Sequence, residues 1–152
     1  MRIGIDARLY GNKHTGIGRY AKNLILNLAK TDRKNTYIIF GKKDIESEIS
    51  SLKRFKFVKL NTPIYSLAEQ IINPIVFLRA KLDLLHVPHF NAPILYPGKL
   101  VITVHDLIKH ISTGKETTTH STVVYWIKQI IYRLVVFINI KKASVIITPS
   151  KF

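Results

Sequence analysis

Short apolar runs recur along the chain and are separated by longer segments in which apolar residues follow helical spacing. An apolar run of roughly four to eight residues between turn residues is typical of a strand buried in a sheet. Segment 55–60 differs, because apolar and polar residues alternate in it as in a half-exposed strand. The pattern predicts strands at residues 3–5, 37–40, 55–60, 84–87, 100–104 and 144–150.

Helical periodicity predicts the elements between these strands. Ser66 followed by Glu69 is a capping-box pattern, in which a serine side chain caps the start of a helix. Pro74 lies inside the same segment and is expected to kink that helix. The predicted helices cover residues 17–30, 44–52, 66–81 and 121–141.

Strands and helices therefore alternate, which is typical of an α/β fold. We predict a single Rossmann-like domain over residues 1–152, with a mostly parallel sheet, right-handed crossovers and helices on both faces. Ligands of such sheets bind at the carboxyl ends of the strands, in the crevice where the strand order reverses. Candidate functional residues are therefore sought just after each strand.

Polar side chains follow two of the predicted strands directly. His105 and Asp106 come after the fifth strand, and His89 and Asn91 come after the fourth. Because the carboxyl ends of parallel strands share one edge, we expect these groups to face one crevice. Asp106 would alternatively cap the segment that follows it.

The loop after the first strand contains a glycine-rich segment. Gly16 and Gly18 lack side chains, so that a ligand can approach backbone N–H groups at the start of a helix. Arg19 can add a charge for a phosphate or a carboxylate. The two glycines can equally well serve only to start the helix, and both roles stay open.

Residues 16–21 also match the dinucleotide pattern G-x-G-x-x-A. In that motif the first glycine directly follows a strand, whereas ten residues separate Ile5 from Gly16 here. The second strand ends at Gly41 without the acidic residue that would hold a ribose. These departures disfavour a nucleotide-dependent oxidoreductase.

Three histidines, His86, His89 and His105, raise the question of a metal site. Their positions follow no recurrent ligand spacing, and a metal site also needs fixed geometry and supporting hydrogen bonds. His86 lies inside an apolar run, where a hydrogen-bonded core histidine is expected. We therefore predict no metal and no cofactor.

The helix at 121–141 is apolar but is interrupted by polar residues, which excludes a transmembrane span. One side of it forms an apolar stripe that is expected to pack in the core. The aromatic residues Tyr125, Trp126 and Tyr132 keep contact with a membrane surface as an alternative. The stripe consists of Val123, Ile127, Ile130, Leu134 and Ile138.

The chain is strongly basic, with 24 Lys and Arg against 9 Asp and Glu and a net charge of +15. Nucleic acid, an anionic membrane and phosphorylated small molecules are the partner classes that such a charge attracts. The basic residues are scattered and accompany no RNA-binding or zinc-finger signature, which disfavours nucleic acid. A lysine-rich solvated surface without a partner is the simplest interpretation, and attraction to a membrane is about equally favoured. The absence of cysteine excludes disulfides and thiolate chemistry, and the amino-terminal segment is no signal peptide.

Five segments in order carry a resemblance to a known family: "MRIGIDAR", "TGIGRYAKNLILNL", "LLHVPHFNAP", "LVITVHDLI" and "ASVIITPSKF". Together they resemble the amino-terminal half of the family 4 glycosyltransferases, which are retaining enzymes of GT-B architecture. The resemblance implies two Rossmann-like domains that face a cleft. The first domain would mainly bind the acceptor, and the second would mainly bind a nucleotide-sugar.

The resemblance also implies roles for individual residues. The glycine segment 16–18 would line the cleft near the donor phosphates and the acceptor. His105 would contact the transferred sugar, and Asp106 would help to shape the pocket. His89 and Asn91 would lie on the acceptor side.

One departure from the family concerns its pair of glutamates in the second domain. In the family these two glutamates are seven residues apart, and no two glutamates of this sequence have that spacing. The sequence ends at Phe152 with no second domain. We therefore expect an incomplete half: a fragment, a truncated gene product or a subunit of a split enzyme, inactive alone. The glutamates are Glu46, Glu48, Glu69 and Glu116.

The partners expected from the resemblance are a nucleotide-sugar and a glycan or lipid-linked acceptor in cell-envelope polysaccharide synthesis, together with a chain that supplies the second domain. The expected location is the cytoplasm, with possible peripheral attachment to the inner face of an anionic membrane. The alternative is a basic module that binds a membrane or polyanion without catalysis.

Overall fold

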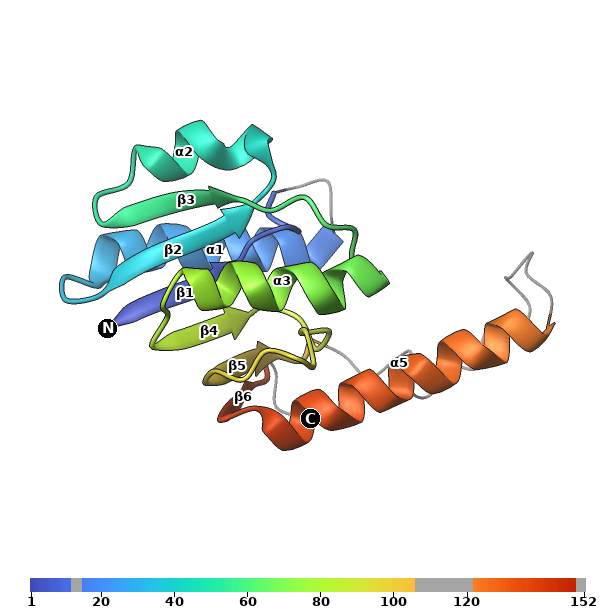
Figure 1. Cartoon of the computed structure of the whole chain (residues 1–152). Coiled ribbons are helices and arrows are strands. Elements are labelled where there is room, and N and C mark those ends of the chain that lie inside the picture. Colours follow the sequence, from blue (N-terminus) through green and yellow to red (C-terminus); the bar gives the residue numbers. More distant parts are fainter. Residues whose placement is uncertain (12–14, 106–121, 150–152) are drawn as a thin grey trace.

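The strands form a single parallel sheet in the order β3-β2-β1-β4-β5-β6 (Figure 1). The computed structural model describes residues 1–11, 15–105 and 122–149. All neighbouring strands in this part of the chain pair in parallel, which confirms the predicted Rossmann-like α/β fold. The strands are β1 (Arg2–Asp6), β2 (Thr36–Gly41), β3 (Phe55–Lys59), β4 (Leu84–Val87), β5 (Leu100–Thr103) and β6 (Val145–Ile147).

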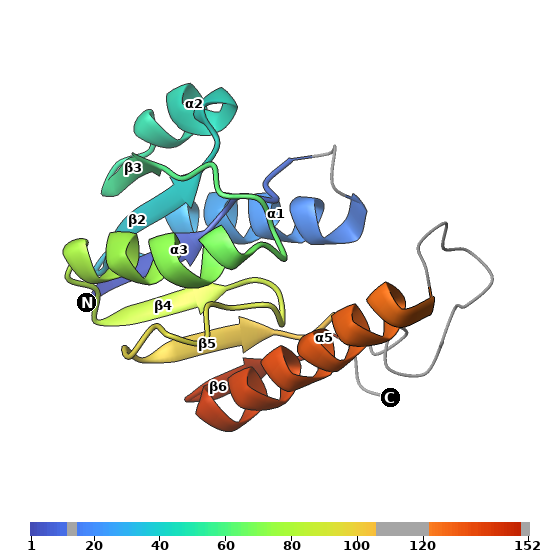
Figure 2. The same ribbon diagram turned by 45° about the vertical axis from the view of Figure 1, so that its right-hand side comes forward.

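Helices cover both faces of the sheet. Figures 1 and 2 show α1 behind the sheet, and α3 and α5 in front of it. The predicted short helix at 44–52 is a 3₁₀ turn, η2, followed by α2. The helical elements are α1 (Thr15–Thr31), η2 (Lys43–Ile45), α2 (Glu46–Ser50), α3 (Leu67–Arg79) and α5 (Thr122–Lys142).

The core consists of one apolar cluster on each face of the sheet. Ile5 and Ile39 pack with Ile25 of α1, whereas Leu85 and Ile102 pack with Phe77 of α3. Successive strand residues point to opposite faces, so a strand covered on both sides is apolar throughout. The edge strand β3 is only partly covered, as predicted, but its burial does not alternate strictly, because the adjacent residues Phe57 and Val58 are both half-buried.

The start of α3 confirms the predicted cap but changes the role of its glutamate. The Ser66 hydroxyl accepts a hydrogen bond from the backbone N–H of Glu69 at 3.1 Å. The Glu69 side chain reaches Arg8 and Asn91 rather than the Ser66 backbone. Pro74 is buried inside the helix. The sequence pattern therefore located the helix correctly while its glutamate serves a buried polar network.

The predicted core stripe of α5 is wrong at Ile130 and Leu134, whereas Ile138 of the same stripe is half-buried. Ile130 and Leu134 are 63% and 54% exposed, whereas Val136 and Asn139 are buried. The Asn139 amide donates to the carbonyls of Phe90 and Ala92 at 3.2 and 2.8 Å. Because the β4–β5 loop has these buried carbonyls, the helix turns the side that carries Val136 and Asn139 toward that loop. In the described part of the chain, no helix combines the length and apolarity needed to cross a membrane.

Candidate ligand site at the carboxyl edge of the sheet

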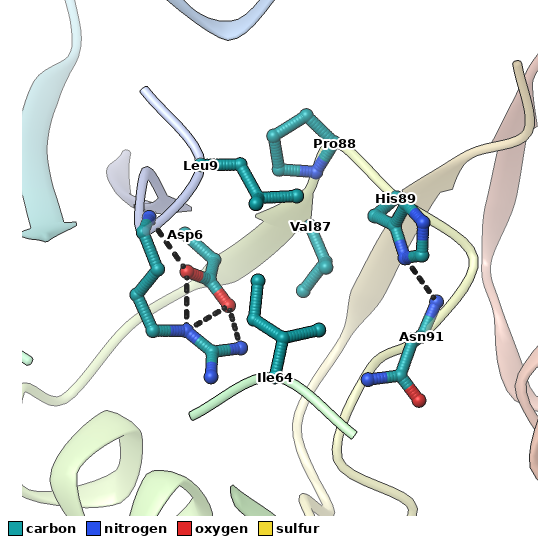
Figure 3. Close-up of a pocket in the computed structure, with 8 residues that line it drawn as sticks. Asp6, Leu9, Ile64, Val87, Pro88, His89 and Asn91 are labelled. Atoms are coloured by element: carbon teal, nitrogen blue, oxygen red, sulfur yellow. Dashed lines mark hydrogen bonds and ion pairs between the residues drawn. The ribbon is translucent and has the colours of Figure 1, made fainter. Parts of the chain in front are cut away.

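A pocket opens where the strand order reverses, between the carboxyl ends of β1 and β4 (Figure 3). Its empty space is about 270 Å³, part of which is open to solvent. This is the place where doubly wound sheets bind ligands, as expected from the sequence. The residues that line it are Asp6, Arg8, Leu9, Ile64, Val87, Pro88, His89 and Asn91.

One wall of the pocket is a buried ionic network, here called the arginine cluster: Asp6, Arg8 and Glu69. Arg8 Nη2 lies 2.6 Å from Asp6 Oδ2 and 2.5 Å from Glu69 Oε1, and Arg8 Nε lies 2.9 Å from Asp6 Oδ1. Burial acts to lower the pKa of Arg8, but the two carboxylates outweigh it and raise that pKa above its ordinary value. The guanidinium is therefore neutralised from within the protein.

The remaining donors of Arg8 are also engaged. Arg8 Nη1 lies 3.2 Å from both the carbonyl and the hydroxyl oxygen of Thr62, in the loop before α3. Thr62 in turn donates its hydroxyl to Asn73 Oδ1 of α3 at 2.6 Å. Because all three guanidinium nitrogens of Arg8 are engaged in hydrogen bonds, Arg8 connects the end of β1 to α3 and has little capacity to bind an anionic ligand.

Glu69 links this network to the residues predicted as acceptor-side contacts. Glu69 Oε2 accepts from Asn91 Nδ2 and from the Tyr65 backbone N–H, both at 2.8 Å. The Asn91 N–H donates to His89 Nδ1 at 3.1 Å (Figure 3). His89 therefore carries its proton on Nε2, which lies 3.3 Å from the Tyr65 hydroxyl. Tyr65 has a φ of 62°, in the left-handed region that is costly for a bulky residue.

A second group, here called the histidine cluster, lies on the α1 side of β4 and β5: Tyr20, His86, Thr103 and His105. His86 Nε2 is 2.9 Å from the Thr103 hydroxyl, and the Tyr20 hydroxyl is 3.4 Å from it. Burial, assisted by the nearby His105, lowers the pKa of His86 to about 4. His86 is thus a neutral, hydrogen-bonded core histidine at pH 7, as predicted.

His105 is held in place by its neighbours at the edge of the sheet. Its Nε2 donates to the Pro88 carbonyl at 3.1 Å. Its ring meets the Tyr20 ring edge to face, with centroids 4.8 Å apart. Pro88 also lines the pocket, so this hydrogen bond ties the end of β5 to the pocket wall.

The glycine-rich segment reaches the site through a different residue from those predicted. Gly16 and Arg19 are exposed and do not line the pocket. A Cβ on Gly18 would lie 2.2 Å from the Gly11 carbonyl oxygen and 2.4 Å from that of Leu9, so Gly18 is required by close packing. Tyr20, which touches His105, is the residue of this segment that joins the site. Asp106 lies outside the described residues.

Sequence reasoning missed the ionic part of the site. Asp6 and Arg8, at the end of the first strand, are visible in the sequence as polar residues after an apolar run, but no local pattern predicts their role. For Glu69 the sequence predicts only a helix cap, because its partner Arg8 is distant in sequence. Among the described residues, no group of three or more His, Cys, Asp and Glu side chains has a geometry suited to a metal ion.

Comparison with models of known protein families gives no match for this chain, and comparison with curated proteins also gives none.

Proposed function

We propose that the chain is the acceptor-side half of a retaining glycosyltransferase, which transfers a sugar from a nucleotide-sugar to a glycan or lipid-linked acceptor. The observation that carries the proposal is the meeting of three resemblance segments at one edge of the sheet. One pocket is lined by Asp6, Arg8, His89 and Asn91. His105 is hydrogen-bonded to Pro88, which lines the same pocket. The 3-2-1-4-5-6 strand order supports the proposal by placing this pocket at the switch point.

His105 is the residue proposed to contact the transferred sugar. Retaining transfer builds positive charge on the sugar ring and negative charge on the leaving phosphate. A ring held by Pro88 and Tyr20 is oriented before substrate arrives, so that little ordering is needed during the reaction. Asp106, the next residue in the chain, is proposed to shape the same pocket.

His89 and Asn91 are proposed to face the acceptor. The contacts of Glu69 with Asn91, and of Asn91 with His89, fix the tautomer of the imidazole and the direction of the amide. The Asn91 side-chain amide, which has both a carbonyl oxygen and N–H groups, is suited to sugar hydroxyls, which both donate and accept hydrogen bonds. Arg8 is proposed to support this wall, because its own carboxylates already neutralise it.

The proposal requires a second domain that binds the nucleotide-sugar across the pocket. The glycine segment, with Gly16, Gly18 and Arg19, is proposed to face the donor phosphates from the α1 side. Neither a metal nor another cofactor is part of the proposed reaction. The proposed setting is cell-envelope polysaccharide synthesis on the cytoplasmic side of a membrane.

The test is to join this chain, by fusion or co-expression, to a donor-binding domain encoded directly downstream or in a neighbouring gene. His105→Ala should lower kcat by about 10²-fold or more, the scale of one lost electrostatic contact in a transition state. The same change should alter the free energy of unfolding by less than about 1 kcal/mol, because the half-buried His105 lies outside both core clusters. Both quantities are measured on one preparation.

His86→Gln is the matched control, since His86 is a buried histidine in the same cluster and should affect mainly stability. Retained activity together with a collapsed denaturation midpoint in His105→Ala would identify His105 as a structural residue. Turnover of nucleotide-sugars by the 152-residue chain alone would contradict the need for two domains.

A further inference from the structure

The outward side of α5 carries large apolar side chains where a solvent-facing helix normally carries polar ones. Trp126, Ile130, Leu134 and Phe137 are spaced by three or four residues and therefore share one side of the helix. Each of them is at least 41% exposed. These four residues are called the α5 stripe below.

A second stripe of the same kind lies on α3. Leu67, Ile71, Ile75 and Leu78 repeat the spacing of the α5 stripe, and each is at least 47% exposed. The two helices lie on the same face of the sheet in both views (Figures 1 and 2). Scattered exposed apolar residues need no explanation, but two apolar stripes on helices of one layer indicate an interaction surface.

The charges on these two helices are cationic. In the described structure, the acidic residue that they contain is Glu69, which is completely buried against Arg8. Arg79, Arg133 and Lys141 are exposed. Lys142 is engaged with the carbonyls of Ile94 and Tyr96. The surface thus combines exposed apolar side chains with positive charge and presents no exposed carboxylate from either helix.

We propose that this surface attaches the protein to an anionic membrane, with the α5 stripe lying in the headgroup region parallel to the bilayer. A helix that binds in this way has apolar and aromatic residues on one side and Lys or Arg beside them. Trp126 is suited to the interface, because tryptophan prefers the boundary between headgroups and acyl chains. Anionic lipids also complement the net charge of +15.

Other occupants fit the surface less well. A second copy of the chain would bring a second charge of +15 to the same interface, where like charges repel. The donor-binding domain of the proposed enzyme would face the pocket at the carboxyl edge and not the helical layer. Figure 1 shows the amino-terminal half of α5 extending beyond the carboxyl ends of the strands. Attachment through α5 would therefore hold the pocket edge near the lipid surface.

The chain supplies its own reporter for the test, because Trp126 is its single tryptophan and lies in the α5 stripe. The purified chain is mixed with phosphatidylcholine vesicles, with or without phosphatidylglycerol. We expect a blue shift of Trp126 emission and quenching by brominated acyl chains only when phosphatidylglycerol is present. Added salt should weaken binding, since charges are screened over about 8 Å at physiological ionic strength.

A triple variant, Ile130→Ser with Leu134→Ser and Phe137→Ser, removes most of the α5 stripe and keeps the tryptophan. It should reduce partitioning onto the anionic vesicles by at least about tenfold, the scale expected for losing several partly inserted apolar side chains. Val145→Ser, on the edge strand β6, is the matched control because Val145 is exposed but outside both stripes. Its binding should equal that of the unchanged chain.

Circular dichroism and a denaturation midpoint verify that the triple variant is folded, as expected for changes at exposed positions. Equal binding to vesicles with and without phosphatidylglycerol, or unchanged binding of the triple variant, would overturn the proposal. A concentration-dependent dimer abolished by the triple variant would also overturn it, by making a second copy the occupant. No sugar transfer is measured, so failure here leaves the proposed glycosyltransferase activity to its own test.

Discussion

The arginine cluster and the histidine cluster lie at the same edge of the sheet, but on opposite faces and with different degrees of closure. In the arginine cluster, charged contacts of 2.5–3.1 Å surround the guanidinium of Arg8, a residue that is 4% exposed. In the histidine cluster, the hydrogen-bond distances are 2.9–3.4 Å, and His105, which bonds to Pro88, is only half buried. The two clusters at this edge therefore differ in burial and in how closely their polar groups are paired.

The difference indicates which polar residues at this edge can act on a ligand. A buried ion is tolerated only when its partners satisfy it, and a group with every donor engaged has none to offer a substrate. The arginine cluster is accordingly expected to stabilise the structure, although charged residues at this edge would by themselves suggest a ligand site. The histidine cluster combines a buried neutral anchor, His86, with the partly exposed His105. It is the cluster in which a catalytic contact is expected.

The largest effect should follow from opening the arginine cluster. Arg8→Met leaves Asp6 and Glu69 buried side by side without their counter-ion. We expect a loss of about 3–5 kcal/mol in the free energy of unfolding, the range found when one partner of a buried pair is removed. Urea denaturation measures this change.

Arg79→Met is the control for the arginine variant, because Arg79 is an exposed arginine on α3, the helix that carries Glu69. It should change the free energy of unfolding by less than about 0.5 kcal/mol. Equal small shifts in the two variants would show that the arginine cluster adds little stability and would remove the proposed contrast between the clusters.

The next effect concerns His86 and depends on pH. Its pKa falls from 6.5 to about 4 on folding, so the unfolded chain binds the extra proton between these values. The contribution of neutral His86 to the free energy of unfolding is complete above pH 6.5 and is lost as the pH falls toward 4. The free energy of unfolding should therefore decrease by about 3 kcal/mol over this pH window, at about 1.4 kcal/mol per pKa unit.

His86→Gln isolates this contribution, since glutamine can still bond to Thr103 but does not titrate. Urea denaturation at a series of pH values should give a flatter pH dependence for the variant than for the unchanged chain. Carboxylates titrate in both proteins, so the difference between the two curves is the quantity to compare. Parallel curves would mean that His86 is protonated as easily in the folded state as in the unfolded one.

The two clusters were not equally visible in the sequence. Apolar runs and helical spacing predicted the parallel sheet and most helices, because burial on both faces leaves a local pattern in each strand. The sequence predicts His105 and His89 as site residues for the same reason, because they are polar residues that follow apolar strands. The arginine cluster joins residues 6–8 to residue 69, and a local sequence pattern cannot predict a contact between residues so distant in sequence. The predicted orientation of α5 is wrong at Ile130 and Leu134, because the buried Asn139 satisfies carbonyls of a distant loop.

The smallest effect should come from the glycine segment that brings Tyr20 to His105. A Cβ on Gly18 would collide with two backbone carbonyl oxygens, which cannot move as a flexible side chain does, whereas a Cβ on Gly16 meets no atom within 4 Å. Gly18→Ala should therefore cost about 1–3 kcal/mol, as overpacking usually does. Gly16→Ala should be neutral or slightly stabilising, because alanine favours a helix by up to about 1 kcal/mol over glycine.

Denaturation midpoints of the two alanine variants give the difference directly, since both positions lie in the first turns of α1 and share the gain in helix propensity. The His105 ring signals in an NMR spectrum should shift in Gly18→Ala and not in Gly16→Ala, because Tyr20 lies against that ring. Equal stabilities with unchanged His105 signals would mean that the packing of Gly18 does not control the histidine cluster. Gly18 would then be available for the other role considered for it, close approach of a ligand to the backbone at the start of α1.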